Sequence, residues 1–290
     1  MHNHHHDHSS HDHSGHDHSS HDAGDLGNLL DLDAEMLHPL LADVIAWIGE
    51  LADAEPLRIA DLGAGTGTGA LALAERFPGA EIIAVDKDPE MLERLLAKHG
   101  ARDRVRAVEA DLDAALPDLG ALDLVWAASS LHHLADPDRL LGEVLAALRP
   151  GGLLAAVEMD SFPRFLPDDI GFGRPGLEAR CHAALAEGHA AQVPLFGDDW
   201  GTRLRRAGFA VEPERVFTAD LRAPLPPAAG PYAHAFLSRL RTRLDDLLDA
   251  GDLAALDRLT GHGPESLLHR ADLTVRAKRS VWAAKRPLDR

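Results

Sequence analysis

The segment IADLGAGTGTGA, residues 59–70, constrains the fold of this chain more than any other stretch. It begins as a short apolar run and continues into a loop that has a glycine at every second position, from Gly63 to Gly69. A buried strand followed by a glycine-rich loop and a helix is typical of α/β proteins that bind a ligand outside the carboxyl ends of their strands. The segment therefore predicts an α/β fold with a ligand at this loop.

The same loop fits two cofactor patterns. From Gly65 it reads G-T-G-T-G-A, which satisfies the G-x-G-x-x-G/A pattern of dinucleotide-binding oxidoreductases. From Asp61 it reads as an acidic residue, a spacer and alternating glycines, as in S-adenosylmethionine (SAM) methyltransferases. A pyrophosphate at the helix N-terminus would be repelled by Asp61, whereas the ammonium and sulfonium groups of SAM would be attracted by it. Asp61 therefore favours the methyl donor.

Strand patterns alternate with helix patterns as far as residue 160. The helix expected at 88–100 is well signalled, because Asp88 is a good N-cap residue and Pro89 suits the first helical position. Five strands alternating with helices imply a parallel, doubly wound sheet. The strands are expected within residues 57–63, 80–86, 104–112, 122–130 and 152–160.

The C-terminal part continues this sheet with two further strands, at 209–221 and 273–284. The last of them alternates apolar and polar residues, which indicates a half-exposed, antiparallel strand. The expected fold is thus a Rossmann-like, doubly wound, mostly parallel seven-stranded sheet with an antiparallel last strand and helical insertions. Its expected divisions are a lead helix at 29–56, a ligand-binding core at 57–160 and substrate-covering segments at 161–290 of the same domain.

Residues 1–28 differ in kind from the rest, because they are rich in His, Asp and Ser and contain ten of the nineteen histidines. Such a segment cannot bury apolar surface, so we expect a disordered tail. Interleaved imidazoles and carboxylates can bind metal ions incidentally through a shifting set of ligands. We expect no metal site in the core.

Composition excludes several classes of partner. A formal net charge of -18 disfavours binding to nucleic acid. No apolar run approaches 18 residues and the N-terminus lacks a signal-peptide pattern, so we expect no membrane partner. A single cysteine, Cys181, fits a reducing cytoplasm. The expected acceptor is a small organic molecule, and the oligomeric state is left open.

The segments 59–92, 108–112 and 122–152, taken together and in order, resemble the class I SAM-dependent methyltransferases, especially the small-molecule group near the ubiquinone-type enzymes. The distinctive part is LDLVWAASSLHHLADPDRLLGEVLAALRPGG, at 122–152. The resemblance covers residues 35–160 well and continues weakly through 197–212 and 275–287. Residues 161–197 and 224–270 match nothing in the shared core of the family.

This resemblance implies SAM as the cofactor and assigns its binding residues. The loop around the methionine part would comprise Asp61, Gly63, Ala64, Gly65 and Gly67. The remaining groups are Asp86 for the ribose, Lys87 beside the adenine, Asp111 and the backbone of Leu112 for the adenine, and Ala128 and Ser129 near the sulfonium.

The implied reaction is methyl transfer by in-line displacement, which requires alignment and a base only where the acceptor holds a proton. His132 and His133 are candidates for a base or an acceptor contact, and Glu158 and Asp160 are lesser candidates. Two alternatives remain open at this point: a non-catalytic SAM-binding or metal-responsive protein, and an NAD(P)-dependent oxidoreductase.

Overall fold

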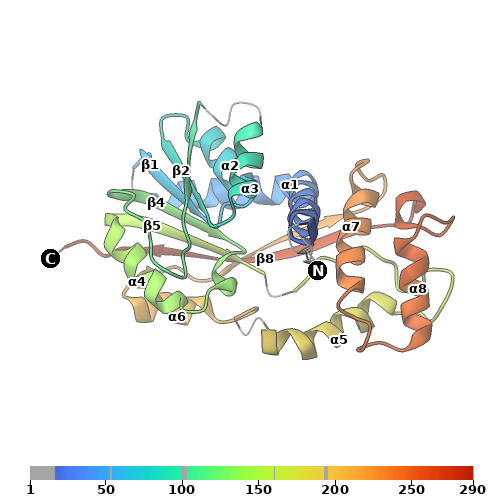
Figure 1. Cartoon of the computed structure of the whole chain (residues 1–290). Helices are drawn as coiled ribbons and strands as arrows, with labels where there is room; N and C mark the ends of the chain where they lie inside the picture. Colours follow the sequence, from blue (N-terminus) through green and yellow to red (C-terminus); the bar gives the residue numbers. More distant parts are fainter. Residues whose placement is uncertain (1–16, 53, 99–102, 160, 193–194, 290) are drawn as a thin grey trace, which may run out of the picture.

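A computed structural model describes residues 17–52, 54–98, 103–159, 161–192 and 195–289 of the chain. Its centre is one twisted sheet with helices on both faces (Figure 1). The strands are β1 Arg58–Leu62, β2 Glu81–Asp86, β3 Val105–Glu109, β4 Leu122–Ala128, β5 Leu148–Glu158, β6 Ala210–Val211, β7 Arg215–Leu221 and β8 Val275–Lys285. The α-helices are α1 Asp17–Leu51, α2 Thr68–Arg76, α3 Pro89–Ala97, α4 Pro137–Ala147, α5 Leu177–Gln192, α6 Trp200–Ala207, α7 Ala229–Arg241 and α8 Ala250–Thr260.

The sheet has the order β3-β2-β1-β4-β5-β8-β6, and β7 also pairs with β8. Strands β1 to β5 are mutually parallel, whereas β8 runs antiparallel to β5. The expected doubly wound sheet with an antiparallel last strand is therefore confirmed. Because the chain proceeds from β1 toward β2 on one side and from β4 toward β5 on the other, the loops after β1 and β4 diverge. The crevice between such loops is where open α/β sheets bind ligands.

The structure differs from the expected seven strands at residues 209–221. This stretch forms two strands, β6 and β7, that pair with different parts of β8. The break contains Pro213, which has no N–H to donate to a sheet. The sheet therefore has eight strands within the described residues.

Strand β8 is also less exposed than its alternating sequence predicts. Its first half alternates, but from Ser280 to Ala284 every residue is buried. Strand β5 pairs with one edge of β8, and β6 and β7 pair with the other edge. Helix α6 also packs against β8. Pairing on both edges makes β8 an interior strand.

The helices divide into layers that bury different sides of the sheet. One apolar cluster joins α1, α2 and α3 to one face, and a second joins α4 and α6 to the other. A third cluster lies among α1, α5, α7 and α8, which Figure 1 shows grouped beside one end of β8. A cavity separates α1 from the carboxyl ends of β1, β2 and β4.

Helix α1 begins twelve residues earlier than the expected lead helix, so the prediction of a disordered tail up to residue 28 is wrong for residues 17–28. Farther along α1, Arg94 of α3 donates hydrogen bonds to Asn28 Oδ1 (2.5 Å) and Asp31 Oδ2 (2.9 Å). These bonds hold α1 against α3 at residues 28–31. Residues 1–16, which carry most of the histidine repeat, lie outside the described residues.

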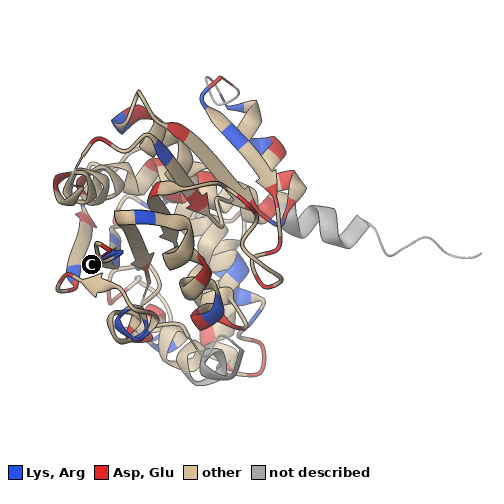
Figure 2. Cartoon of the chain, turned by 90° about the vertical axis from the view of Figure 1, so that its left-hand side faces the viewer, with Lys and Arg blue, Asp and Glu red and all other residues tan. Residues whose placement is uncertain are grey.

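Charged side chains of both signs are interspersed along the described elements (Figure 2). None of the helices in the described part of the chain is long and apolar enough to cross a membrane.

Candidate functional site

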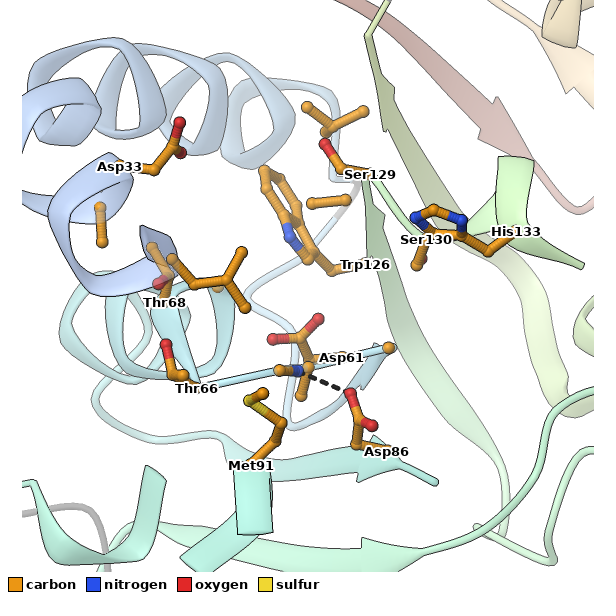
Figure 3. Close-up of a pocket in the computed structure, with 18 of the residues that line it drawn as sticks. Asp33, Asp61, Thr66, Thr68, Asp86, Met91, Trp126, Ser129, Ser130 and His133 are labelled. Atoms are coloured by element: carbon orange, nitrogen blue, oxygen red, sulfur yellow. Dashed lines mark hydrogen bonds between the residues drawn. The ribbon is translucent and has the colours of Figure 1, made fainter. Parts of the chain in front are cut away.

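A cavity of about 590 Å³ lies between α1 and the carboxyl ends of β1, β2 and β4 (Figure 3). Its volume is within the range of small-molecule sites. Most of the residues expected to form the site line it: Asp61, Gly63, Ala64, Gly65, Asp86, Lys87, Asp111, Leu112, Ala128, Ser129 and His133. Two expected residues, Gly67 and His132, do not belong to the lining.

The glycine loop is fastened to the end of β2 by backbone groups. The N–H groups of Gly63 and Ala64 both donate to the carbonyl of Val85, at 2.8 and 3.0 Å. Asp86 accepts a third bond, from the N–H of Gly65 to Oδ2 at 2.7 Å, shown dashed in Figure 3. Its Oδ1 accepts the N–H of Asp88 at 3.0 Å. Asp86 thus positions the loop, and each of its oxygens retains a second lone pair that could accept a ribose hydroxyl.

Asp61 lies at the floor of the cavity and is 2% exposed. Burial, together with the nearby charge of Asp86, raises the pKa of the Asp61 carboxyl to about 7, against the lowering effect of a hydrogen bond from the backbone of Ala70. A side chain at Gly69 would crowd this group, because its Cβ would lie 2.7 Å from Asp61 Oδ2. The glycine therefore allows α2 to approach the carboxylate closely.

Three buried polar atoms at this floor have no hydrogen-bond partner within the described part of the chain: Asp61 Oδ2, Thr66 Oγ1 and Trp126 Nε1. Unpaired buried polar atoms are costly, and in a cavity they indicate a ligand that completes them. A carboxylate acceptor suits an ammonium group, whereas an indole N–H and a hydroxyl suit oxygen atoms. The donor set therefore fits the amino-acid end of SAM.

The wall on the β4 side is held in a strained conformation. Ser129 has φ 52°, in the left-handed region that non-glycine residues rarely adopt. Its N–H donates to the carbonyl of Val157 at 2.7 Å, and Ser130 Oγ donates to the carbonyl of Leu62 at 2.8 Å. These bonds tie the end of β4 to β5 on one side and β1 on the other. Backbone strain maintained in this way is frequent at functional sites.

The loop after β3 forms the opposite end of the cavity. Asp111 Oδ1 accepts the N–H of Asp113 at 3.0 Å, and Asp113 Oδ1 accepts the N–H of Ala135 at 2.8 Å. Arg139 of α4 donates to the carbonyl of Leu112 at 2.5 Å. The region expected to hold the adenine is thus linked to the segment that follows β4.

The two candidate histidines have different surroundings. His132 is 4% exposed, and its Nδ1 lies 2.5 Å from Oε2 of the equally buried Glu158. The other oxygen of Glu158 accepts the N–H of Leu131 at 2.9 Å. His133 is exposed and lines the cavity, with its ring centroid 4.1 Å from that of His132. Glu158 therefore fixes the short helix η1, Leu131–His133, and Asp160 lies outside the described residues.

Four charged residues in the lining were not assigned to the site from the sequence: Asp33 of α1, Asp88, Asp113 and Arg279 of β8. Figure 3 shows Asp33 projecting from α1 above the floor of the cavity. Arg279 had a detectable signal, because it occupies the apolar column of the last strand between Ala277 and Val281. Asp33 had none, since an acidic residue on a lead helix is ordinarily solvated.

Residues 60–154 match the family model described as a methyltransferase domain. The chain contains a class I SAM-dependent methyltransferase domain. It is 44% identical over 111 residues to the demethylmenaquinone methyltransferase of Thermus thermophilus, a match that covers 38% of this chain and 50% of the relative. It is 34% identical over 187 residues to the malonyl-[acyl-carrier protein] O-methyltransferase of Laribacter hongkongensis, covering 61% of this chain and 59% of the relative.

The chain thus spans between half and three fifths of the length of these relatives. Among solved structures, a Bacillus halodurans protein assigned as a methyltransferase has a TM-score of 0.50 and 16% identity, and the match covers 83% of this chain and 98% of that one. That likeness confirms the fold of the methyltransferase domain.

Proposed function

We propose that this protein transfers a methyl group from SAM to a small organic acceptor. The observation that carries the proposal is the unpartnered Asp61 Oδ2 at the floor of the cavity, within a domain of the methyltransferase family. A buried carboxylate in this position suits the ammonium of SAM and opposes the pyrophosphate of a dinucleotide. Bound SAM supplies a methyl carbon that its sulfonium has already activated.

The residues proposed to hold SAM are those of the sequence-based assignment. Asp61 and the loop from Gly63 to Gly67 would surround the methionine part, with Gly67 shaping the loop from outside the cavity. Asp86 would accept the ribose hydroxyls. The adenine would lie among Lys87, Asp111 and Leu112, and Ala128 and Ser129 would lie near the sulfonium.

The protein's main contribution to methyl transfer is alignment in a site from which water is excluded. Apolar side chains of α1 form one wall of the cavity, with Val157 of β5 also in the lining. These α1 residues are Leu26, Leu30, Ala34, Leu37, Leu40, Leu41 and Val44. A dry wall of this kind protects the donor from hydrolysis and holds the acceptor in line.

We propose His133, rather than His132, as the residue that contacts the acceptor or removes its proton, because His133 lines the cavity. His133→Ala is expected to lower turnover by at least about tenfold and to leave affinity for S-adenosylhomocysteine (SAH) unchanged. Turnover is measured as transfer of labelled methyl from SAM to a library of small organic acids, alcohols and amines. Equal turnover in both proteins would remove His133 from the mechanism.

Asp86→Ala tests the proposed cofactor site. The variant loses a charged acceptor for the ribose and the bond that holds Gly65, so SAH affinity is expected to fall at least about tenfold. Isothermal titration calorimetry measures the change, with Asp220→Ala as an exposed control whose carboxylate accepts hydrogen bonds from Arg222. Unchanged affinity in Asp86→Ala would mean that the cofactor site is misplaced.

The acceptor is proposed to be a small molecule, in line with the names of the relatives. The net charge of -18 supports the proposal that the protein does not bind nucleic acid, because it would repel the phosphate backbone. The buried free thiol of Cys181 supports a reducing, cytoplasmic location. The histidine-rich segment is proposed to bind metal ions incidentally, without a role in methyl transfer.

A further inference from the structure

Arg279 is a buried cation in the wall of the cavity that no role proposed above uses. Its residue is 8% exposed, and it projects from β8, the strand that pairs with β5. Its neighbours on the same side of the strand, Ala277 and Val281, are apolar and buried. An arginine in such a column interrupts an otherwise continuous apolar surface, and burial of its charge is unfavourable unless an anion compensates it.

Within the part of the chain that the structure describes, the contacts of Arg279 compensate its charge only in part. Nη1 donates to the carbonyl of Lys278 at 3.0 Å, and Nη2 lies 3.5 Å from Asp33 Oδ1, beyond the usual hydrogen-bond length. A guanidinium has five N–H donors, so these contacts use at most two of them. The group is therefore equipped to bind a further anion.

Asp33 is itself shared with a second group. Tyr232 of α7, 1% exposed, donates its hydroxyl to the same oxygen, Asp33 Oδ1. Burial and the adjacent carboxylate hold the pKa of Tyr232 well above its ordinary value, so the phenol keeps its proton and remains a donor. Tyr232 thus fixes the position of Asp33. Its hydrogen bond is made to the same carboxylate oxygen that faces Arg279, so this oxygen is shared between the two groups.

We infer that Arg279 binds a carboxylate group of the methyl acceptor. The inference rests on the proposed function, because it assigns the acceptor to the same cavity. The planar guanidinium fork matches a carboxylate bidentately. A phosphate dianion suits the site less well, since Asp33 lies beside the guanidinium and would repel the second charge.

The methionine carboxylate of SAM is the other possible source of such a group. Asp61 lies on β1, and the order β1-β4-β5-β8 places Arg279 three strands away, about 14 Å across the sheet. The ammonium and carboxylate of methionine are attached to one carbon, so a ligand anchored by Asp61 holds both groups at the β1 end. The β8 end of the cavity is left to the acceptor.

The test compares four proteins, each saturated with SAH: wild type, Arg279→Met, Arg279→Lys and the control Arg222→Met, which removes an exposed cation from the end of β7. Calorimetric titration with succinate, citrate, dimethyl succinate and inorganic phosphate measures anion binding. A separate titration of the ligand-free proteins with SAH measures the cofactor site, and thermal unfolding verifies that each variant is folded.

Succinate or citrate is expected to bind wild type and Arg222→Met, with affinity falling about tenfold to a hundredfold in Arg279→Met and by less in Arg279→Lys. Dimethyl succinate is expected not to bind any of the four proteins. The SAH affinity of each variant is expected to stay within about twofold of the wild-type value. The inference is overturned if neither carboxylate binds wild type, if the variants bind it equally, or if phosphate binds more tightly than both. Loss of SAH affinity in Arg279→Met would assign Arg279 to the methionine carboxylate, whereas failure of wild type to bind SAH would refute the proposed function itself.

Discussion

Asp61→Asn is expected to weaken binding of SAM and SAH by about a hundredfold, the largest effect of any single substitution in the site. Asparagine keeps the shape of the side chain but removes the negative charge that would face the ammonium of the ligand. The change leaves the fold intact, because an uncharged amide is easier to bury than a carboxylate. Calorimetric titration with SAH at neutral pH measures the difference.

The pH dependence of binding separates a charge effect from a change of shape. The pKa of Asp61 is raised from 3.8 to about 7 in the folded protein. A raised pKa contributes stability that is fully present below 3.8 and is lost as the pH rises through 7, because the folded state then holds a carboxylate at a cost. The ligand-free wild type should therefore lose stability relative to Asp61→Asn between about pH 4 and 7.

Ligand binding should show the opposite trend. Since the ammonium requires the ionised form of Asp61, the SAH affinity of wild type is expected to rise with pH up to about 7, relative to that of Asp61→Asn. Titration of SAH itself affects both proteins equally, so it cancels when the affinity of the variant is compared with that of wild type at each pH. Parallel pH profiles for wild type and variant would show that the charge of Asp61 does not contribute.

Gly67→Ala is expected to lower the free energy of unfolding by about 2–5 kcal/mol, the sum of backbone strain and overpacking. Gly67 precedes α2 with φ 86°. A Cβ at this position would lie 2.3 Å from Cγ of Leu95, a fully buried side chain of α3. The loop and α3 would have to separate, which would also distort the cavity. Chemical denaturation measures the change in stability.

Gly142→Ala is the matched control for this substitution. Gly142 lies in α4 on the exposed surface, and a Cβ there would meet no atom within 4 Å. Alanine at that position should stabilise the protein by about 0.5–1 kcal/mol, because it reduces the freedom of the unfolded chain. A destabilisation of Gly67→Ala no larger than that of an ordinary surface variant would show that the loop does not need glycine.

The cofactor end of the cavity could be predicted from the sequence because its signals are local. The glycine loop follows directly from β1, Asp86 ends β2, and Asp88 with Pro89 begins α3 as expected. Each of these positions is set by a strand end or a helix cap within a few residues. The parallel arrangement of the first five strands then brings the separate signals to one edge of the sheet.

The acceptor end could not be predicted in the same way, since it depends on contacts between distant segments. Tyr232 and Asp33 are 199 residues apart in the chain. Residues 28 and 31 of α1 are bonded to Arg94 of α3, more than 60 residues away in the chain. His132 and His133 are adjacent, yet His132 is buried against Glu158 while His133 lines the cavity, and the pairing of His132 with Glu158 requires the register of β4 against β5.

One measurement tests the central claim most directly: calorimetric titration of the full-length protein with SAH and, separately, with NADH. Saturable binding of SAH with no binding of NADH is expected, because Asp61 lies where a dinucleotide would place its pyrophosphate. Binding of NADH in preference to SAH, or no binding of SAH, would contradict the assignment of this cavity to a methyl donor.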